Sequence, residues 1–157
     1  MPLFDTIQSL EFFTAIRESA LVYPVLLASH LSSIALFGGA ILMTDLRLLG
    51  LAMTDHPAQD VIGQLRNWKR IGFIIMAVTG ILLAGAKAET YYGNPYIQLK
   101  LGLLVLVGVH ALIFRRRVYR NAAPMPGIAK LAACLSLALW AGIVSAGRLI
   151  AYYEPLR

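Results

Sequence analysis

The sequence predicts an all-α integral membrane protein: a four-helix bundle with up-down-up-down topology, preceded by an N-terminal amphipathic interfacial helix. Of the 157 residues, 59% are hydrophobic and only 14% are charged, whereas a soluble domain carries roughly a quarter charged residues. Four nearly charge-free stretches are each about as long as a helix that crosses a bilayer. The basic residues gather at the ends of these stretches, which is typical of membrane helices.

The four expected spans cover residues 21–43, 71–86, 97–114 and 128–153, within a single transmembrane domain of residues 1–157. A segment that crosses a bilayer must satisfy its backbone polar groups internally, so we expect each span to be an α-helix. Lys100 lies near the start of the third span, and Arg148 lies near the end of the fourth.

Residues 2–19 have apolar side chains at helical spacing and charged side chains on the other faces. This pattern predicts an amphipathic helix that lies in the membrane interface, with a loosely ordered tail as the alternative. The segment lacks the basic start and compact apolar core of a signal peptide. After the first span, Gly50 is expected to terminate a helix, and residues 93–95 (Gly-Asn-Pro) predict a turn before the third span.

The basic residues also predict an orientation. The first and third connections are rich in them, and the second has only Lys87 and Lys100 at its margins. The positive-inside rule therefore places both termini in the periplasm of a multi-pass protein of the bacterial inner membrane. The tyrosines at 91, 92, 96, 152 and 153 would then form an outer aromatic belt, and Trp68 and Tyr119 would mark the inner side. The net charge of +6 predicts no nucleic-acid partner, because it is spread over span ends. The basic residues of the first and third connections are Arg47, Arg66, Lys69, Arg70, Arg115, Arg116, Arg117, Arg120 and Lys130.

Two histidines, His30 and His110, lie inside apolar spans. An ionisable side chain at membrane depth is a candidate functional residue. Two such histidines on different spans suggest that they bind a shared partner, and haem iron is the first partner to consider. Their expected depths differ by roughly 10 Å, from the rise per helical residue. Two alternatives concern ligands: Lys100 or a methionine as the second ligand of His30, and a separate site for His110 with His56. Two others are structural: hydrogen bonding of His30 to a neighbouring helix, and His110 as an interfacial histidine beside the arginines at 115–117.

A haem would also need partners for its propionates, and Lys100 and Arg148 are the candidates. Such cations otherwise pair with a carboxylate, here at Glu11, Glu89 or Glu154, or extend to the interface. Asp45 and Arg47 are two residues apart and do not face each other on a helix, so each is expected to find separate partners and to anchor the inner helix ends. Copper stays an open alternative, although no ligand spacing indicates it, and His56 lacks the spacing of a metal site with Asp55 or Asp60.

Several runs resemble a group of uncharacterised bacterial four-helix membrane proteins. They are His30-Leu31-Ser32-Ser33, Gly38-Gly39, Asp45-Leu46-Arg47-Leu48-Leu49-Gly50, Thr79-Gly80, Asn94-Pro95-Tyr96 and Leu99-Lys100-Leu101. The layout is also distantly similar to copper-resistance membrane proteins and the membrane protoporphyrinogen oxidase. His30 and Lys100 match a histidine and a lysine that are characteristic of that oxidase, while Tyr96 stands in the region of its tryptophan. The resemblance implies a b-type haem protein.

These observations lead to the expectation of a membrane b-type cytochrome, with haem-mediated electron transfer across or within the membrane. His30 and His110 are the expected iron ligands, and Lys100 and Arg148 the expected propionate partners. A haem-dependent oxidoreductase activity stays open, with no catalytic residue identified. We expect a homo-oligomer with a quinone or periplasmic redox partner. The alternatives are a non-enzymatic accessory subunit, whose many glycines would serve packing, and a metal or small-solute transporter.

Overall fold

The computed structural model describes residues 2–119 and 126–153, with side chains over 4–114 and 127–153, and this part of the chain is helical without strands. The helices are α1 (Pro2–Ser9), α2 (Glu11–Glu18), α3 (Val22–Leu49), α4 (Ala58–Ala86), α5 (Ala88–Tyr92), α6 (Pro95–Tyr119) and α7 (Pro126–Ile150). Tyr119 and the arginines at 115–117 fall where no side chain is described, and Arg120 and Glu154 lie outside the described residues.

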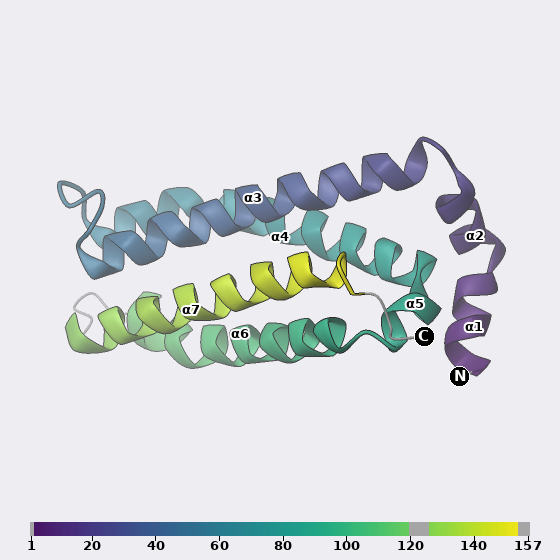
Figure 1. Cartoon of the computed structure of the whole chain (residues 1–157). Coiled ribbons are helices and arrows are strands. Elements are labelled where there is room, and N and C mark those ends of the chain that lie inside the picture. The colour runs from purple at the N-terminus through teal and green to yellow at the C-terminus, as the bar shows by residue number, and fades with distance from the viewer. Residues whose placement is uncertain (1, 120–125, 154–157) are drawn as a thin grey trace.

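The four long helices α3, α4, α6 and α7 run antiparallel in sequence order and form the predicted bundle (Figure 1). Each is long and apolar enough to cross a membrane. The α3–α4 and α6–α7 hairpins are closely packed, and α3 joins them by packing on α7. α4 and α6 do not pack closely on each other. The predicted fold class is therefore confirmed.

Three of the helices are longer than the expected spans, and α6 continues from residue 114 to Tyr119. α3 continues to Leu49, and α4 begins at Ala58 rather than near residue 71. Hydropathy marks only the membrane-embedded part of a helix, whereas the helix continues into polar residues while its backbone bonds persist. α3 ends where predicted: Gly50 has φ +79°, and the N–H groups of Gly50 and Leu51 donate to the Arg47 and Leu46 carbonyls at 3.1 and 2.9 Å. This left-handed cap favours glycine.

The apolar core joins all four long helices. Met76, Trp140 and Ile143 are buried at its centre, and the Phe37 ring contacts Trp140 edge-on with ring centroids 5.2 Å apart. Most other apolar side chains are exposed on the outside of the bundle, including Leu112 and Ile81 at 71% and 69%. Such an apolar surface is expected of a protein solvated by lipid chains.

The N-terminal segment forms two short helices rather than the single one expected. They break at Leu10 and lie across one end of the bundle, close to α5 (Figure 1). We call this the cap end, and the opposite end, which carries the α3–α4 connection, the basic end. Phe12 is 61% exposed while Ile16 is buried, so the segment has the expected amphipathic character. Because it crosses the helix ends, it is oriented as an interfacial helix would be.

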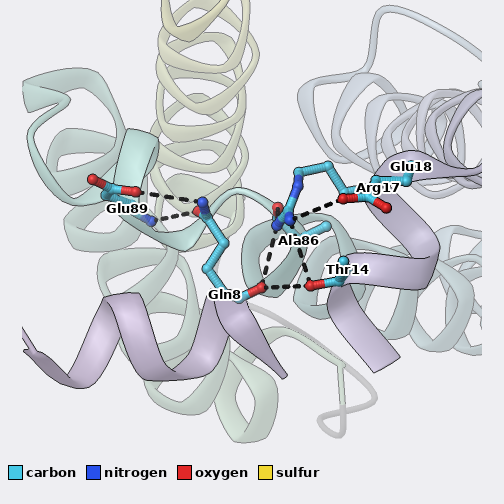
Figure 2. Close-up of polar contacts among 6 residues, drawn as sticks. All are labelled: Gln8, Thr14, Arg17, Glu18, Ala86 and Glu89. Carbon is cyan, nitrogen blue, oxygen red and sulfur yellow. Dashed lines mark hydrogen bonds and ion pairs between the residues drawn. The ribbon is translucent and has the colours of Figure 1, made fainter. Parts of the chain in front are cut away.

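Polar contacts hold α1 and α2, which we call the cap, on α4 and α5 (Figure 2). Gln8 accepts from the Glu89 backbone N–H through Oε1 at 2.9 Å and donates to the Glu89 carboxylate at 3.5 Å. The Arg17 guanidinium donates to the backbone carbonyls of Gln8 and Ala86, at 3.2 and 3.4 Å. These bonds satisfy carbonyls left open at the ends of α1 and α4.

The predicted turn at residues 93–95 joins α5 to α6. Asn94 is buried, its Oδ1 accepts from the Tyr96 backbone N–H at 3.0 Å, and its Nδ2 donates to the Ile150 carbonyl at 3.3 Å. The same side chain therefore shapes the turn and holds the end of α7. The five tyrosines expected in one belt lie in or beside α5, the start of α6 and the end of α7, at the cap end.

Candidate functional site

His30 lies in the third turn of α3 and points toward α4. Its Nδ1 is 3.0 Å from the Thr79 hydroxyl oxygen. The ring sits directly over Gly80, where a Cβ would lie only 3.0 Å from His30 Cε1. A residue with a side chain at position 80 would therefore displace the imidazole, and glycine permits this close approach.

The Thr79 hydroxyl determines which nitrogen of His30 carries the proton. A hydroxyl has one hydrogen, and Thr79 donates it to the Ile75 carbonyl at 2.6 Å, with the Met76 carbonyl at 3.3 Å as a second acceptor. The Thr79 oxygen must then accept from His30 Nδ1–H. A neutral imidazole has one N–H, so Nε2 carries the lone pair in this tautomer. The backbone of Met76 also forms a hydrogen bond with the His30 ring.

Lys100 reaches the same region from α6. Its ammonium group acts electrostatically on the His30 ring, and its Nζ lies 3.7 Å from the point where a Cβ of Gly147 would be. Lys100 is half-buried, and no carboxylate or other hydrogen-bond acceptor of the described residues pairs with it. The bundle thus places the amine of α6 within electrostatic range of the imidazole of α3, with Thr79 as the group that orients the ring.

His110 belongs to a different part of the bundle. Its Nε2 donates to the Ala132 carbonyl of α7 at 3.0 Å, and its ring contacts Phe114 with centroids 4.8 Å apart. Along α6, His110 is ten residues beyond Lys100, or about 15 Å by helical rise. The two histidines contact different helices, because His30 bonds Thr79 of α4 and His110 bonds Ala132 of α7.

Arg148 is also placed away from His30. It is exposed at the end of α7, donates to the Tyr152 hydroxyl, and lies 4.7 Å from the centre of the Tyr152 ring. No described carboxylate pairs with it. His56 is exposed in the α3–α4 connection, where its backbone carbonyl accepts from Arg47 Nε at 2.8 Å. No group of three metal-ligating side chains is found among the described residues.

A second polar cluster lies toward the basic end. Asp45 is only 1% exposed, forms a side-chain hydrogen bond with Ser136 of α7, and interacts electrostatically with Lys69 of α4. Lys69 donates to the Thr44 hydroxyl at 3.1 Å. The second carboxylate oxygen of Asp45 has no hydrogen-bond partner in the described part of the chain. Asp45 and Arg47 have separate partners, as expected from their spacing.

The His30 region fits a b-type haem on the chemistry of its donors. Iron-ligating imidazoles bind through one nitrogen while the other donates a hydrogen bond that orients the ring, and His30 has this arrangement with Nε2 as its lone-pair nitrogen. Lys100 supplies a second amine donor or a cation for a propionate. His110 donates Nε2–H to the Ala132 carbonyl and leaves Nδ1 as its lone-pair nitrogen, but it lies about 15 Å along α6 from Lys100.

Nothing in the sequence pattern alone pairs Thr79 with His30, because the pairing depends on the register between α3 and α4. The Ser136 contact of Asp45 depends in the same way on the docking of α7. The only sequence signal for Thr79 was its place beside Gly80, where a hydroxyl and a small residue adjoin in an apolar span.

Residues 16–153 match the model of a protein family described as a family of unknown function, DUF6644. The chain belongs to the DUF6644 family. The match includes the four long helices and both polar clusters of this DUF6644 protein. Comparison with curated proteins and with solved structures found no match. The family description names no activity, so the chemistry of this DUF6644 chain is argued from its own residues.

Proposed function

We propose that this protein is a membrane b-type cytochrome that binds haem through His30 and passes electrons across or within the bilayer. The single observation that carries the proposal is the placement of His30: the imidazole lies inside a membrane-spanning helix, and its Nδ1 is held 3.0 Å from the Thr79 hydroxyl, which orients the ring. An imidazole held this way resembles the second-shell arrangement of haem and metal ligands.

Lys100 is the second element of the proposal. Its amine acts electrostatically on His30 and has no carboxylate partner among the described residues. An unneutralised cation in an apolar bundle is costly unless an anion or a metal accepts it. A haem would supply both an iron and two carboxylates. The resemblance of His30 and Lys100 to the oxidase positions supports the same pair. The cofactor would supply the redox chemistry, while this chain orients the imidazole and excludes water.

The proposed location is the bacterial inner membrane, with the cap end and both termini on the periplasmic side. Its support is the asymmetry of the basic residues, which favour the cytoplasmic side. Electrons would then enter or leave near the periplasmic face, from a quinone or a periplasmic redox protein. A four-helix bundle has a narrow interior, and we propose that copies of the chain associate in the membrane.

An absorption spectrum tests the proposal. The full chain purified in detergent from haem-replete cells should show a Soret band that shifts on reduction with dithionite. His30→Ala should lose this spectrum, because the proposed ligand imidazole is removed. His110→Ala is the matched control: it removes an imidazole from the same bundle, and the spectrum should persist because that ring lies about 15 Å along α6 from Lys100.

Three results would reject the proposed function. One is a colourless wild-type protein after haem-replete expression, which would favour an accessory subunit or a transporter. Another is an unchanged spectrum in His30→Ala. The third is loss of the spectrum in His110→Ala but not in His30→Ala, which would place the haem at the other histidine.

A further inference from the structure

Two arginines mark the place where α4 leaves the apolar part of the bundle at the basic end. Arg66 and Arg70 are four residues apart, so they lie one turn apart on the same face of α4. Both are exposed. The same face continues toward the cap end with Ile74 and Ile81, which are 59% and 69% exposed. A pair of guanidinium groups therefore stands at the end of an apolar, outward-facing stripe.

Neither arginine is neutralised within the described part of the protein. No hydrogen bond or ion pair joins Arg66 or Arg70 to another described residue. Arg66 acts electrostatically on Lys69, which adds a third positive charge to the same turn. The buried carboxylate of Asp45 interacts with Lys69 and Ser136 instead. Trp68 lies between the two arginines in the sequence, on another face of α4. It is 56% exposed, as is common for tryptophan at the membrane interface.

We propose that Arg66 and Arg70 form a binding site for the phosphate group of an anionic phospholipid. A guanidinium presents a planar fork of N–H donors that matches phosphate oxygens, and two forks one turn apart can hold the same group. Below the phosphate, the acyl chains run along Ile74 and Ile81. The excess positive charge favours lipids with a net negative headgroup over zwitterionic ones. This site is independent of the proposed haem.

Native mass spectrometry of the detergent-purified full chain tests this site. The protein is mixed with equal amounts of phosphatidylglycerol and phosphatidylcholine that carry the same acyl chains, and the bound lipids are counted. The wild type should retain mainly phosphatidylglycerol. In the double variant Arg66→Gln with Arg70→Gln, that preference should fall by roughly tenfold or more, because each lost basic residue weakens attraction to anionic lipid several-fold.

Two controls separate a site from a general effect of charge. Lys130→Gln removes one exposed charge from the start of α7 at the same end of the bundle, and it should lower the preference less than Arg70→Gln does. The double variant Arg66→Lys with Arg70→Lys keeps the charge but removes the forks, and it should lose a measurable part of the preference. An equal retention of both lipids by the wild type overturns the proposal, as does an unchanged preference in either double variant.

Discussion

At the scale of single residues, one hydroxyl hydrogen decides the chemistry of the His30 region. Because Thr79 donates to its own helix at 2.6 Å, it can only accept from His30. The imidazole therefore presents Nε2 rather than Nδ1 to the bundle. His110 uses Nε2 for a backbone carbonyl, so two histidines of similar sequence setting have different hydrogen-bonding states.

Thr79→Val tests the role of that hydroxyl. Valine keeps the shape but leaves His30 Nδ1–H without its acceptor, which should lower the free energy of unfolding by about 1 kcal/mol. Under the proposed function it should also weaken haem retention by roughly ten- to a hundredfold. Both quantities are measured on the purified protein, by chemical unfolding and by haem transfer to an acceptor protein. The control is Thr90→Val, the same change at an exposed position of α5. Equal effects of the two variants would contradict the assigned role.

The ionisation of Tyr91 in α5 makes the stability of the folded protein depend on pH. Burial, followed by the charge and the hydrogen bond of Tyr23, raises the pKa of Tyr91 from its ordinary 10.0 to about 12. The folded state thus favours the neutral phenol. The contribution of Tyr91 to stability is complete below pH 10.0, which is the pKa of this tyrosine in the unfolded chain. The contribution is lost as the pH rises through about 12, its pKa in the folded protein.

Absorbance of tyrosinate during an alkaline titration checks this prediction. One tyrosine of the folded protein should ionise in a late phase near pH 12, and Tyr91→Phe should remove that phase. Tyr92→Phe, from the same short helix, should leave it in place. A titration of Tyr91→Phe that still shows the late phase would assign it to another tyrosine.

At the scale of the elements, the docking of α2 on the end of α4 depends on a glycine. A Cβ at Gly85 would lie 2.3 Å from Phe13 Cε1 and 2.4 Å from Cζ. Atoms cannot approach so closely, so any side chain at 85 must move the Phe13 ring. The hydrogen bonds of Gln8 and Arg17 act beside this contact (Figure 2), and together these contacts hold the cap.

Gly85→Ala should therefore loosen the cap and leave the bundle intact. We expect a loss of about 1–3 kcal/mol in the docking of the N-terminal helices, typical of an overpacked contact. Limited proteolysis should cleave the first 20 residues of the variant several-fold faster than those of the wild type. Gly63→Ala is the control on the same helix, because no atom lies within 4 Å of its Cβ position. Cleavage at the wild-type rate in Gly85→Ala would show that Phe13 adjusts without cost.

At the scale of the whole molecule, the exposed apolar surface and the four long helices make a membrane the environment of this fold. The two ends of the bundle differ in character. The cap end has tyrosines and the amphipathic helices, whereas the basic end has Arg66, Lys69, Arg70 and Lys130. A bilayer distinguishes such ends, because basic residues favour the cytoplasmic side.

Cysteine labelling in intact cells measures the orientation. Single cysteines are introduced at Asp55, in the α3–α4 connection, and at Gly93, in the turn before α6. The native thiol at Cys134 is first replaced by alanine. A membrane-impermeant maleimide should label Gly93→Cys in intact cells but Asp55→Cys only after lysis. The reverse pattern would contradict the proposed location of the termini.

The sequence by itself determined the fold class, the approximate spans and the end of α3 at Gly50. These depend on hydropathy, length and backbone preference, which are properties of neighbouring residues. It also identified His30, His110 and Lys100 as ionisable residues within apolar spans, and Asp45 as an anchor at the inner end of the first span. Only the tertiary structure decided which of them meet.

The register between α3 and α4 set Thr79 against His30, and the docking of α7 set Ser136 against Asp45. The same packing placed His110 on Ala132, about 15 Å along α6 from the level of Lys100. It also bent the N-terminal segment at Leu10 so that Phe13 could reach Gly85. Such pairings depend on packing between helices that are distant in the sequence. A local pattern of residues does not determine which side chain of another helix becomes the partner.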